Sequence, residues 1–296
     1  MEKRRIEVVD STILGTLDEC PRKAQYRFQM GMRTRGEHIA LDFGKAYHAG
    51  VGAWYKSGKS IDAAITNFHM VFAKGEEEAI SEKEVRTVHK GQELLLARDR
   101  LFRNETWEIQ GDPEQKFVLD IPNVPMRYVG FVDAFGRETT GEKQYVVQEE
   151  KTSTSPWLFC ARPNAQIVGY VYAARTLFGQ DIRRAYLTMA GIYKSSVDGL
   201  VKGKKKDDQS REVVNREIID LDPWDLEEWV IELKSKAIDL IHYQDHRAHW
   251  PKRTGACGNY GGCPYQAVCI APPKMREFFL ECSFDQEFWS PLDERR

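Results

Sequence analysis

The chain has 296 residues, of which 42% are hydrophobic and 30% are charged, and its formal net charge is −2. This length provides for one large domain or two small ones with a buried core, and the nearly balanced charge means that binding to nucleic acid would depend on local basic patches. The sequence has neither an apolar run of the roughly 18–20 residues that span a bilayer nor the apolar segment of a secretory signal, so we expect a cytoplasmic protein with reduced cysteines.

The first third of the chain has the composition and spacing of helices. Asp10 or Ser11 can cap a first helix, and Pro21 is well placed to begin a second, basic helix. The expected helical segments span residues 12–20, 21–30 and 41–105. Breaks in the longest segment are expected near its glycines Gly50, Gly52 and Gly58.

The composition changes after residue 105, where segments rich in β-branched and aromatic residues alternate with turn formers. Strands are expected over residues 107–110, 115–121, 125–135, 144–151, 183–193 and 212–220. Helices are expected over residues 164–177 and 223–241, the second with a clear amphipathic pattern. Because the strands lie between helical segments, the fold class is α/β or α+β.

An acidic cluster falls on two of the expected strands. The segment G-F-V-D-A-F contains Asp133, and the segment V-V-Q-E-E-K-T-S-T contains Glu149 and Lys151. If the hairpin between them turns symmetrically about Gly141, Asp133 lies opposite Glu149, with Cβ atoms about 4.5–5.5 Å apart. Lys151 then follows on the same face of its strand. Two carboxylates and an ammonium in this arrangement suit metal-assisted cleavage of a phosphodiester, because an ion can bridge the acids while the ammonium faces the phosphate.

Taken alone, these three charges also fit the solvated face of a strand, since Glu-x-Lys triplets are common. A shift of the hairpin register by one residue would move Asp133 to the opposite face. The motifs elsewhere in the chain therefore decide between the two interpretations.

Five motifs occur in order along the chain. They are S-T-I-L-G-T-L-D-E-C-P-R-K-A-Q-Y-R-F at residues 11–28, F-G-K-A-Y-H-A-G at 43–50, G-F-V-D-A-F at 130–135, V-Q-E-E-K-T at 147–152 and Q-I-V-G-Y at 166–170. In this order they resemble the motifs of the PD-(D/E)XK nuclease superfamily. Within it, the chain is similar to the RecB-type branch with an iron–sulfur cluster, which includes AddB-like nucleases and CRISPR-associated exonucleases of the Cas-four type.

The resemblance implies a fold and a domain organisation. We expect an α/β, restriction-endonuclease-like core with a central mixed sheet flanked by helices, a helical N-terminal region and a C-terminal tail that binds an iron–sulfur cluster. These parts would form a single nuclease domain over residues 1–296, with regions at 1–105, 106–222 and 223–296.

The resemblance also implies roles in an active site. It assigns catalytic roles to Asp133, Glu149, Lys151, Gln166 and Tyr170. It implies that Mg²⁺ or Mn²⁺ is held by His48, Asp133, Glu149 and the backbone carbonyl of Glu150. Gln166 and Tyr170 are one helical turn apart, so they can align Lys151 or the scissile phosphate. This branch often has aspartate where the chain has Glu149, which the superfamily also allows. The simpler alternatives are a structural role for His48 and a core position for Tyr170.

Four of the six cysteines lie in the tail of the chain. Cys257, Cys263 and Cys269 are separated by five residues each, whereas zinc sites usually pair cysteines about two to four residues apart. The resemblance implies a structural [4Fe–4S] cluster on these three cysteines and Cys20, although the family has a shorter spacing between the first two. Zinc binding and free buried thiols are the alternatives. Unpaired thiols are expected for Cys160 and Cys282, and a solvent-facing helix surface is expected for His242, His246 and His249.

Two basic segments are candidates for contact with nucleic acid. Arg22, Lys23, Tyr26 and Arg27 combine positive charge with an aromatic ring, which suits a single strand through phosphate neutralisation and base stacking. The run K-G-K-K-K-D-D at residues 202–208 is a second basic patch, but its aspartates weaken it. We therefore expect the N-terminal segment to be the main contact.

Together these expectations describe a metal-dependent deoxyribonuclease, an exonuclease that acts on single strands or duplex ends in recombination, replication or repair of a bacterium or phage. The sequence contains no G-x-x-x-x-G-K-[ST] phosphate loop, so a helicase or recombination protein would supply any unwinding. Two alternatives stay open, namely a non-catalytic DNA-binding or assembly subunit with the same fold and a nuclease directed at RNA.

Overall fold

The computed structural model describes residues 2–36, 39–72, 85–154, 164–192, 214–245 and 249–292. The chain forms two compact units, each built from separate stretches. The first unit comprises Met1–Glu37, Phe117–Gly130 and Glu227–Glu294, and the second comprises His38–Lys116, Phe131–Leu226 and Arg295–Arg296. The single nuclease domain over residues 1–296 stays a prediction. None of the described helices combines the length and apolar character that crossing a membrane requires.

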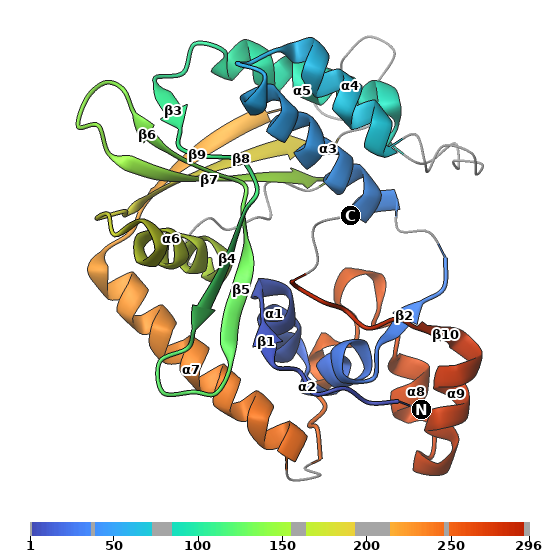
Figure 1. The fold of residues 1–296 in the computed structure, drawn as a ribbon. Helices are drawn as coiled ribbons and strands as arrows, with labels where there is room; N and C mark the ends of the chain where they lie inside the picture. The colour runs from blue at the N-terminus through green and yellow to red at the C-terminus, as the bar shows by residue number, and fades with distance from the viewer. Residues whose placement is uncertain are drawn as a thin grey trace, which may run out of the picture. The chain divides into compact units, whose positions relative to one another are not determined.

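The first unit joins N-terminal and C-terminal segments of the chain (Figure 1). Its helices are α1 (Ser11–Glu19), α2 (Pro21–Ala24), which continues as a π-helix over Gln25–Gln29, most of α7 (Pro223–Asp245), α8 (Gln266–Ile270) and α9 (Arg276–Ser283). The N-cap of α1 is Asp10, whose side chain accepts a hydrogen bond from Ile13 N at 2.7 Å.

Two small sheets complete this part of the fold. The strands β2 (Met32–Thr34) and β10 (Phe284–Gln286) pair antiparallel and tie early residues to the end of the chain. The other sheet has the order β1-β5-β4, formed by β1 (Val8–Val9), β4 (Gln115–Asp120) and β5 (Arg127–Val132).

The second unit is built on a five-stranded sheet with the order β3-β6-β7-β8-β9. Its strands are β3 (Trp107–Ile109), β6 (Ala134–Glu138), β7 (Tyr145–Ser153), β8 (Arg184–Gly191) and β9 (Val214–Asp220). The sheet is mixed, because β7 and β8 are parallel while the other neighbours are antiparallel. This confirms the prediction of an α/β fold with a central mixed sheet.

Helices cover both faces of this sheet (Figure 1). On one side lie α3 (Ile39–Lys56), α4 (Ile61–Phe72) and α5 (Val88–Phe102), and on the other lies α6 (Ala165–Phe178). A crossover such as α6 is what a parallel pair like β7 and β8 requires. On the α3 side, Phe43 meets Phe68 and Phe72 edge to face, with ring centroids 5.5 and 5.4 Å apart. Buried rings of this size contribute a large apolar area, so this core holds α3, the helix that carries His48, in place.

The hairpin of β6 and β7 has the register expected from the sequence. Ala134 pairs with Gln148 and Phe135 pairs with Val147, so the next positions along the two chains are Asp133 and Glu149. The strand expected over 125–135 is interrupted at Asp133, which separates β5 from β6. Asp133 therefore stands at the end of the ladder, where its side chain can turn toward β7.

One helix prediction is wrong. The helix α3 runs unbroken through Gly50 and Gly52, and the chain leaves the helix only near Gly58. A Cβ at Gly50 would lie 3.0 Å from the carbonyl oxygen of Ala64. This glycine therefore permits the close approach of α3 and α4, and it does not end the helix.

Candidate active site

The candidate active site is organised by strand β7 of the second unit. Successive side chains of a strand point to opposite faces of the sheet, so Glu149 and Lys151 lie on one face and Gln148 and Glu150 on the other. Glu149 and Glu150 are buried, at 0% and 1% exposure, whereas Lys151 is partly exposed. A buried carboxylate is unfavourable without a compensating partner, so the contacts of each acid indicate what it does.

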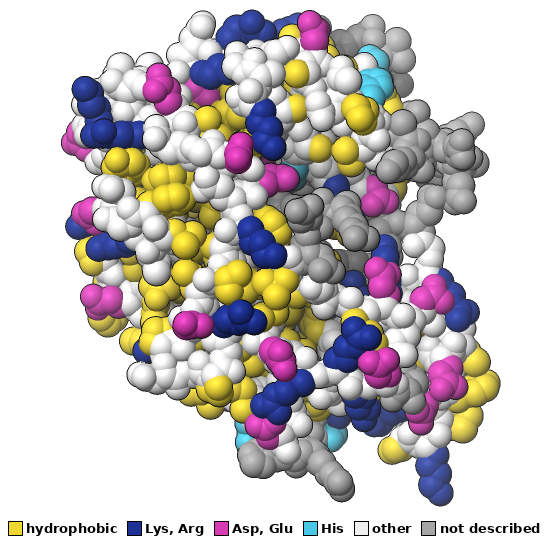
Figure 2. Space-filling view, in the orientation of Figure 1, with side chains coloured by type: hydrophobic (Ala, Val, Ile, Leu, Met, Phe, Trp, Pro, Cys, Tyr) yellow, Lys and Arg dark blue, Asp and Glu magenta, His cyan; other side chains and the backbone are white. Residues whose placement is uncertain are grey.

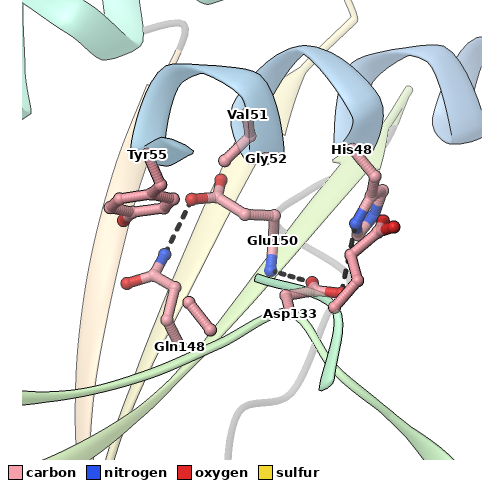
Figure 3. A pocket seen from close by; sticks show the side chains of 9 residues that line it. His48, Val51, Gly52, Tyr55, Asp133, Gln148 and Glu150 are labelled. Atoms are coloured by element: carbon pink, nitrogen blue, oxygen red, sulfur yellow. Dashed lines mark hydrogen bonds and ion pairs between the residues drawn. The ribbon is translucent and has the colours of Figure 1, made fainter. Parts of the chain in front are cut away.

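Asp133 is held from two sides (Figure 3). Its Oδ1 lies 3.2 Å from Nδ1 of His48 on α3, and its Oδ2 accepts a hydrogen bond of 2.9 Å from the backbone N–H of Glu150. The side chains of His48 and Asp133 are 14% and 5% exposed. The hairpin register thus brings Asp133 against β7, and α3 brings an imidazole to the same carboxylate.

Glu149 is the centre of a second group of contacts. Its Oε1 forms an ion pair with Lys151 and accepts a hydrogen bond of 3.2 Å from Nε2 of Gln166. Nε2 of Gln166 also donates to the hydroxyl of Tyr170 at 2.8 Å, one turn along α6. The four residues that the sequence motifs named on β7 and α6 therefore form one connected set.

The start of α6 fixes the position of Gln166. The N-cap of this helix is Asn164, whose Oδ1 accepts hydrogen bonds of 3.1 Å from the backbone N–H groups of Gln166 and Ile167. A side-chain cap of this kind satisfies N–H groups that have no partner within the helix. Gln166 therefore leaves the first turn of α6 at a defined point beside Glu149.

The donor set suits a hard divalent ion. Two carboxylates, a backbone carbonyl and one imidazole are groups that Mg²⁺ and Mn²⁺ accept as ligands. Among the described residues, no three histidine, cysteine, aspartate or glutamate side chains stand together as a ready-made ion site. The His48–Asp133 and Lys151–Glu149 contacts use donor atoms that an ion would need, so ion binding has to loosen these two contacts.

Behind β7 lies a residue that the motifs do not include. Arg98 on α5 is 1% exposed and contacts Oε1 of Glu150 through Nε and Nη2, at 2.9 and 2.7 Å. Burial is the largest single influence on the pKa of Arg98 and acts to lower it, but the charge and hydrogen bond of Glu150 together with the influence of Tyr55 and Tyr47 outweigh burial, and the pKa is raised overall. One feature of the sequence could have indicated that Arg98 is buried. It follows Leu94 by four residues and Leu95 by three, which places it on the apolar side of its helix.

In the first unit, the four cysteines of the predicted cluster line one pocket. Cys20, Cys257, Cys263 and Cys269 border a volume of about 280 Å³. All four are free thiols. Burial raises the pKa of the Cys263 and Cys269 thiols, so both favour the protonated form until a cation stabilises the thiolate.

The long spacing between the first two tail cysteines is accommodated by a closed loop. The backbone N–H of Cys263 donates to the carbonyl oxygen of Cys257 at 2.8 Å. Gly261 and Gly262 have φ values of 85° and 113°, a region of backbone conformation that side chains disfavour. These glycines return the chain so that Cys257 and Cys263 border the same pocket.

The basic segment near the N-terminus differs from the exposed patch that the sequence predicts. Arg22 and Tyr26 are 5% and 4% exposed. Nε of Arg22 donates to the carbonyl oxygen of Trp250 at 2.9 Å, while Lys23 pairs with a glutamate one helical turn earlier at 2.7 Å. This corrects the expectation for Arg22 and Tyr26, because a buried side chain with protein partners is not available to a strand of DNA. Lys23 and Arg27 keep partial exposure.

The visible surface has no single basic region. In Figure 2, the lysine and arginine side chains of the described residues are interspersed with aspartate and glutamate on the face shown.

Three other predictions, for Cys160, His246 and the basic run 202–208, concern positions outside the described residues. The helix α7 ends at Asp245, so His249 does not extend the helical face that carries His242.

Comparison with known proteins relates this site to a family. A sequence model described as the PD-(D/E)XK nuclease superfamily matches residues 11–270. The chain therefore belongs to the PD-(D/E)XK nuclease superfamily, and its mixed sheet with flanking helices is the restriction-endonuclease-like core of that family. No curated protein sequence matches the chain at a significant level.

Several solved structures are similar over much of their length. A candidate exonuclease from Eubacterium rectale is 11% identical, with a TM-score of 0.48 and coverage of 92% of each chain. An alkaline exonuclease from Laribacter hongkongensis is 13% identical, with a TM-score of 0.32 and coverage of 69% of this chain and 91% of that chain. A phage-related exonuclease from Haemophilus somnus is 14% identical, with a TM-score of 0.28 and coverage of 72% and 98%.

The contact between Gln166 and Glu149 leads to a prediction. Replacing Gln166 by methionine keeps the length of the side chain but removes the amide that links Glu149 to Tyr170. We expect nuclease activity to fall about 10–100-fold, the usual effect of losing a group that orients a metal ligand, with little change in melting temperature. The matched control is Gln180→Met, at an exposed glutamine just beyond α6, which should keep full activity. Equal activity of wild type and Gln166→Met would show that this amide does not orient Glu149.

Proposed function

We propose that the protein is a metal-dependent deoxyribonuclease of the RecB-type branch, which acts as an exonuclease on single strands or duplex ends. The observation that supports the proposal is the β6–β7 register, which brings the Asp133 carboxylate to the backbone N–H of Glu150, directly after Glu149, which is paired with Lys151. Membership of the superfamily supplies the class of reaction, which is hydrolysis of a phosphodiester bond.

Each side chain has one task in this mechanism. A Mg²⁺ or Mn²⁺ ion, which supplies a Lewis acid and a more acidic water when bound, would be held by His48, Asp133, Glu149 and the Glu150 carbonyl. The Lys151 ammonium offsets the negative charge that develops on the phosphate. Gln166 restrains Glu149 through its amide, and Tyr170 restrains that amide in turn. These contacts hold the acidic groups in place before the substrate arrives.

The choice of DNA and the exonuclease action rest on the sequence resemblance. Lys23 and Arg27 are the partly exposed basic side chains of the N-terminal segment, and we propose them as phosphate contacts. A helicase or recombination protein would separate duplex strands, because the chain has no phosphate-loop motif. Recombination, replication or repair in a bacterium or phage is the setting that the resemblance implies.

Cleavage assays with a ligand variant test the proposal. Purified protein is incubated with Mn²⁺ and end-labelled single-stranded DNA, duplex DNA or RNA. We expect wild type to shorten DNA, and Glu149→Gln to lose about 100-fold or more of this activity, since a direct ligand should matter at least as much as the groups that orient it. The control is Glu142→Gln, at an exposed glutamate in the turn before β7, which should match wild type.

The other outcomes separate the alternatives. Cleavage of RNA alone would identify an RNA-directed nuclease. No cleavage by wild type, or equal cleavage by Glu149→Gln, would instead favour a non-catalytic subunit that keeps the fold.

We further infer that Cys20, Cys257, Cys263 and Cys269 hold a [4Fe–4S] cluster. Four cysteine thiolates are the usual ligands of such a cluster, and the support is their common pocket and their free thiols. Lys23 and Lys252 line the same pocket, so their charges can offset that of the thiolates. The cluster would tie the start of α2 to the C-terminal tail, a structural role.

Metal analysis of an anaerobic preparation tests this assignment. We expect a brown protein that contains iron and inorganic sulfide in about equal amounts. Cys20→Ser should lose the colour and the iron, because one ligand is removed, while Cys282→Ser, at an exposed free cysteine, should retain both. A colourless anaerobic preparation with stoichiometric zinc would overturn the cluster in favour of a zinc site.

A further inference from the structure

The buried side of β7 holds an ion pair that the proposed chemistry does not use. Nε and Nη2 of Arg98 contact Oε1 of Glu150, and the two side chains are 2% and 1% exposed. The carbon of the guanidinium lies 4.6 Å from the ring centre of Trp54 and 5.0 Å from that of Tyr55. Nη2 also donates to the hydroxyl of Tyr55 at 2.8 Å. These partners together hold the guanidinium in one orientation.

Glu150 receives a further donor from its own strand. Nε2 of Gln148 lies 2.8 Å from Oε1 of Glu150 and 2.7 Å from Oγ1 of Thr188 on β8. Gln148 and Thr188 are fully buried, so these hydrogen bonds form away from water, where they are electrostatically stronger. The Glu150 carboxylate is therefore anchored to α5 through Arg98 and to β8 through Gln148.

The same residue reaches the candidate active site through its backbone. The Glu150 N–H donates to Oδ2 of Asp133 at 2.9 Å, and its carbonyl is the proposed metal ligand. Figure 3 shows the Glu150 carboxylate directed toward Tyr55 and its backbone nitrogen toward Asp133. A movement of the β7 backbone at Glu150 would therefore shift the N–H donor to Asp133 and the carbonyl ligand together.

An ion pair is not required to fill this space. Desolvation of two charges can exceed their attraction, and apolar side chains of similar volume often give equal or greater stability. Buried pairs of this kind can instead specify one conformation. In this sheet, the conformation in question is that of the β7 backbone at Glu150.

We propose that Arg98 is a positioning residue for the metal site. By holding the Glu150 carboxylate, Arg98 fixes the β7 backbone at Glu150. The N–H of that backbone in turn holds the Asp133 carboxylate. This inference rests on the proposed function where it concerns metal binding, and on the hydrogen-bond geometry alone where it concerns Asp133.

The test uses the whole chain and two measurements. Amide hydrogen exchange, followed by NMR, reports on the Asp133–Glu150 hydrogen bond without metal, and EPR titration with Mn²⁺ reports on the assembled site. The variant Arg98→Met/Glu150→Met replaces the pair with apolar side chains. We expect it to fold, with exchange of the residue 150 amide at least about tenfold faster and with Mn²⁺ affinity about 10–100-fold weaker.

A second ion pair on the same sheet provides the control. Arg184 and Glu138 pair at 3.0 Å with side chains 22% and 12% exposed, and Arg184 is the first residue of β8. Because this pair does not contact Glu150 or Asp133 in the described hydrogen bonds, Arg184→Met/Glu138→Met should leave the residue 150 amide and Mn²⁺ binding at wild-type values.

The outcomes are distinct. A folded Arg98→Met/Glu150→Met protein with wild-type values in both measurements overturns the inference. If that variant does not fold, Arg98→Lys decides, because lysine keeps the charge but loses the planar contact through two nitrogens; wild-type values in both measurements would again overturn the inference. If wild type does not bind Mn²⁺ while amide exchange responds as expected, the proposed function fails, and the positioning of Asp133 by Arg98 through the Glu150 backbone stands.

Discussion

The hydrogen bond from the Glu150 N–H to the Asp133 carboxylate is the contact on which the rest of the candidate site depends. Its donor is a backbone N–H of β7, so its position is set by the strand and only the Asp133 side chain can rotate away from it. The β6–β7 register brings Asp133 to this point, and α3 adds His48 on the other oxygen of the same carboxylate. A shift of one residue in that register would put Asp133 and Glu149 on opposite faces of the sheet, so Asp133 would no longer stand with Glu149 and Lys151.

The two adjacent acids of β7 have different surroundings, and this difference separates their roles. Glu149 pairs with Lys151, whose side chain is 25% exposed, so an ion or a phosphate can compete for this contact. Glu150 is paired with Arg98, whose side chain is 2% exposed and packed among aromatic rings, so solvent does not reach that contact. The face of β7 toward α6 thus has an acid, Glu149, that can exchange its partner, while the face toward α5 has an acid, Glu150, that keeps its partner. In the proposed site, one strand would thus provide both the reactive groups and their support.

Local sequence pattern accounts for much of this fold, and contacts between distant residues account for what it misses. Strand alternation and a symmetrical turn predict the β6–β7 register before any tertiary contact is known, and the order of five weak motifs predicts the superfamily. From the sequence alone, Gly50 predicts a break in the helix. The reason for a glycine there is the close approach of α4, which only the packing of the two helices shows. In the sequence, Arg22 has the surroundings of a DNA contact. Its actual partner, the carbonyl oxygen of Trp250, lies 228 residues away, so no local pattern reveals it. Arg98 belongs to no motif, since its partner Glu150 is 52 residues distant and is recognised only once α5 packs on β7.

The most direct measurement of the metal site is anomalous diffraction from crystals of the protein soaked in Mn²⁺. If the site is as described, one anomalous peak is expected at a point enclosed by the His48 imidazole, the Asp133 and Glu149 carboxylates and the Glu150 carbonyl, and the His48–Asp133 contact should lengthen as the ion takes its place. Two results would contradict the assignment of these residues as the metal ligands. One is the absence of a peak at this point at a Mn²⁺ concentration that supports DNA cleavage, and the other is a Mn²⁺ peak elsewhere in the second unit.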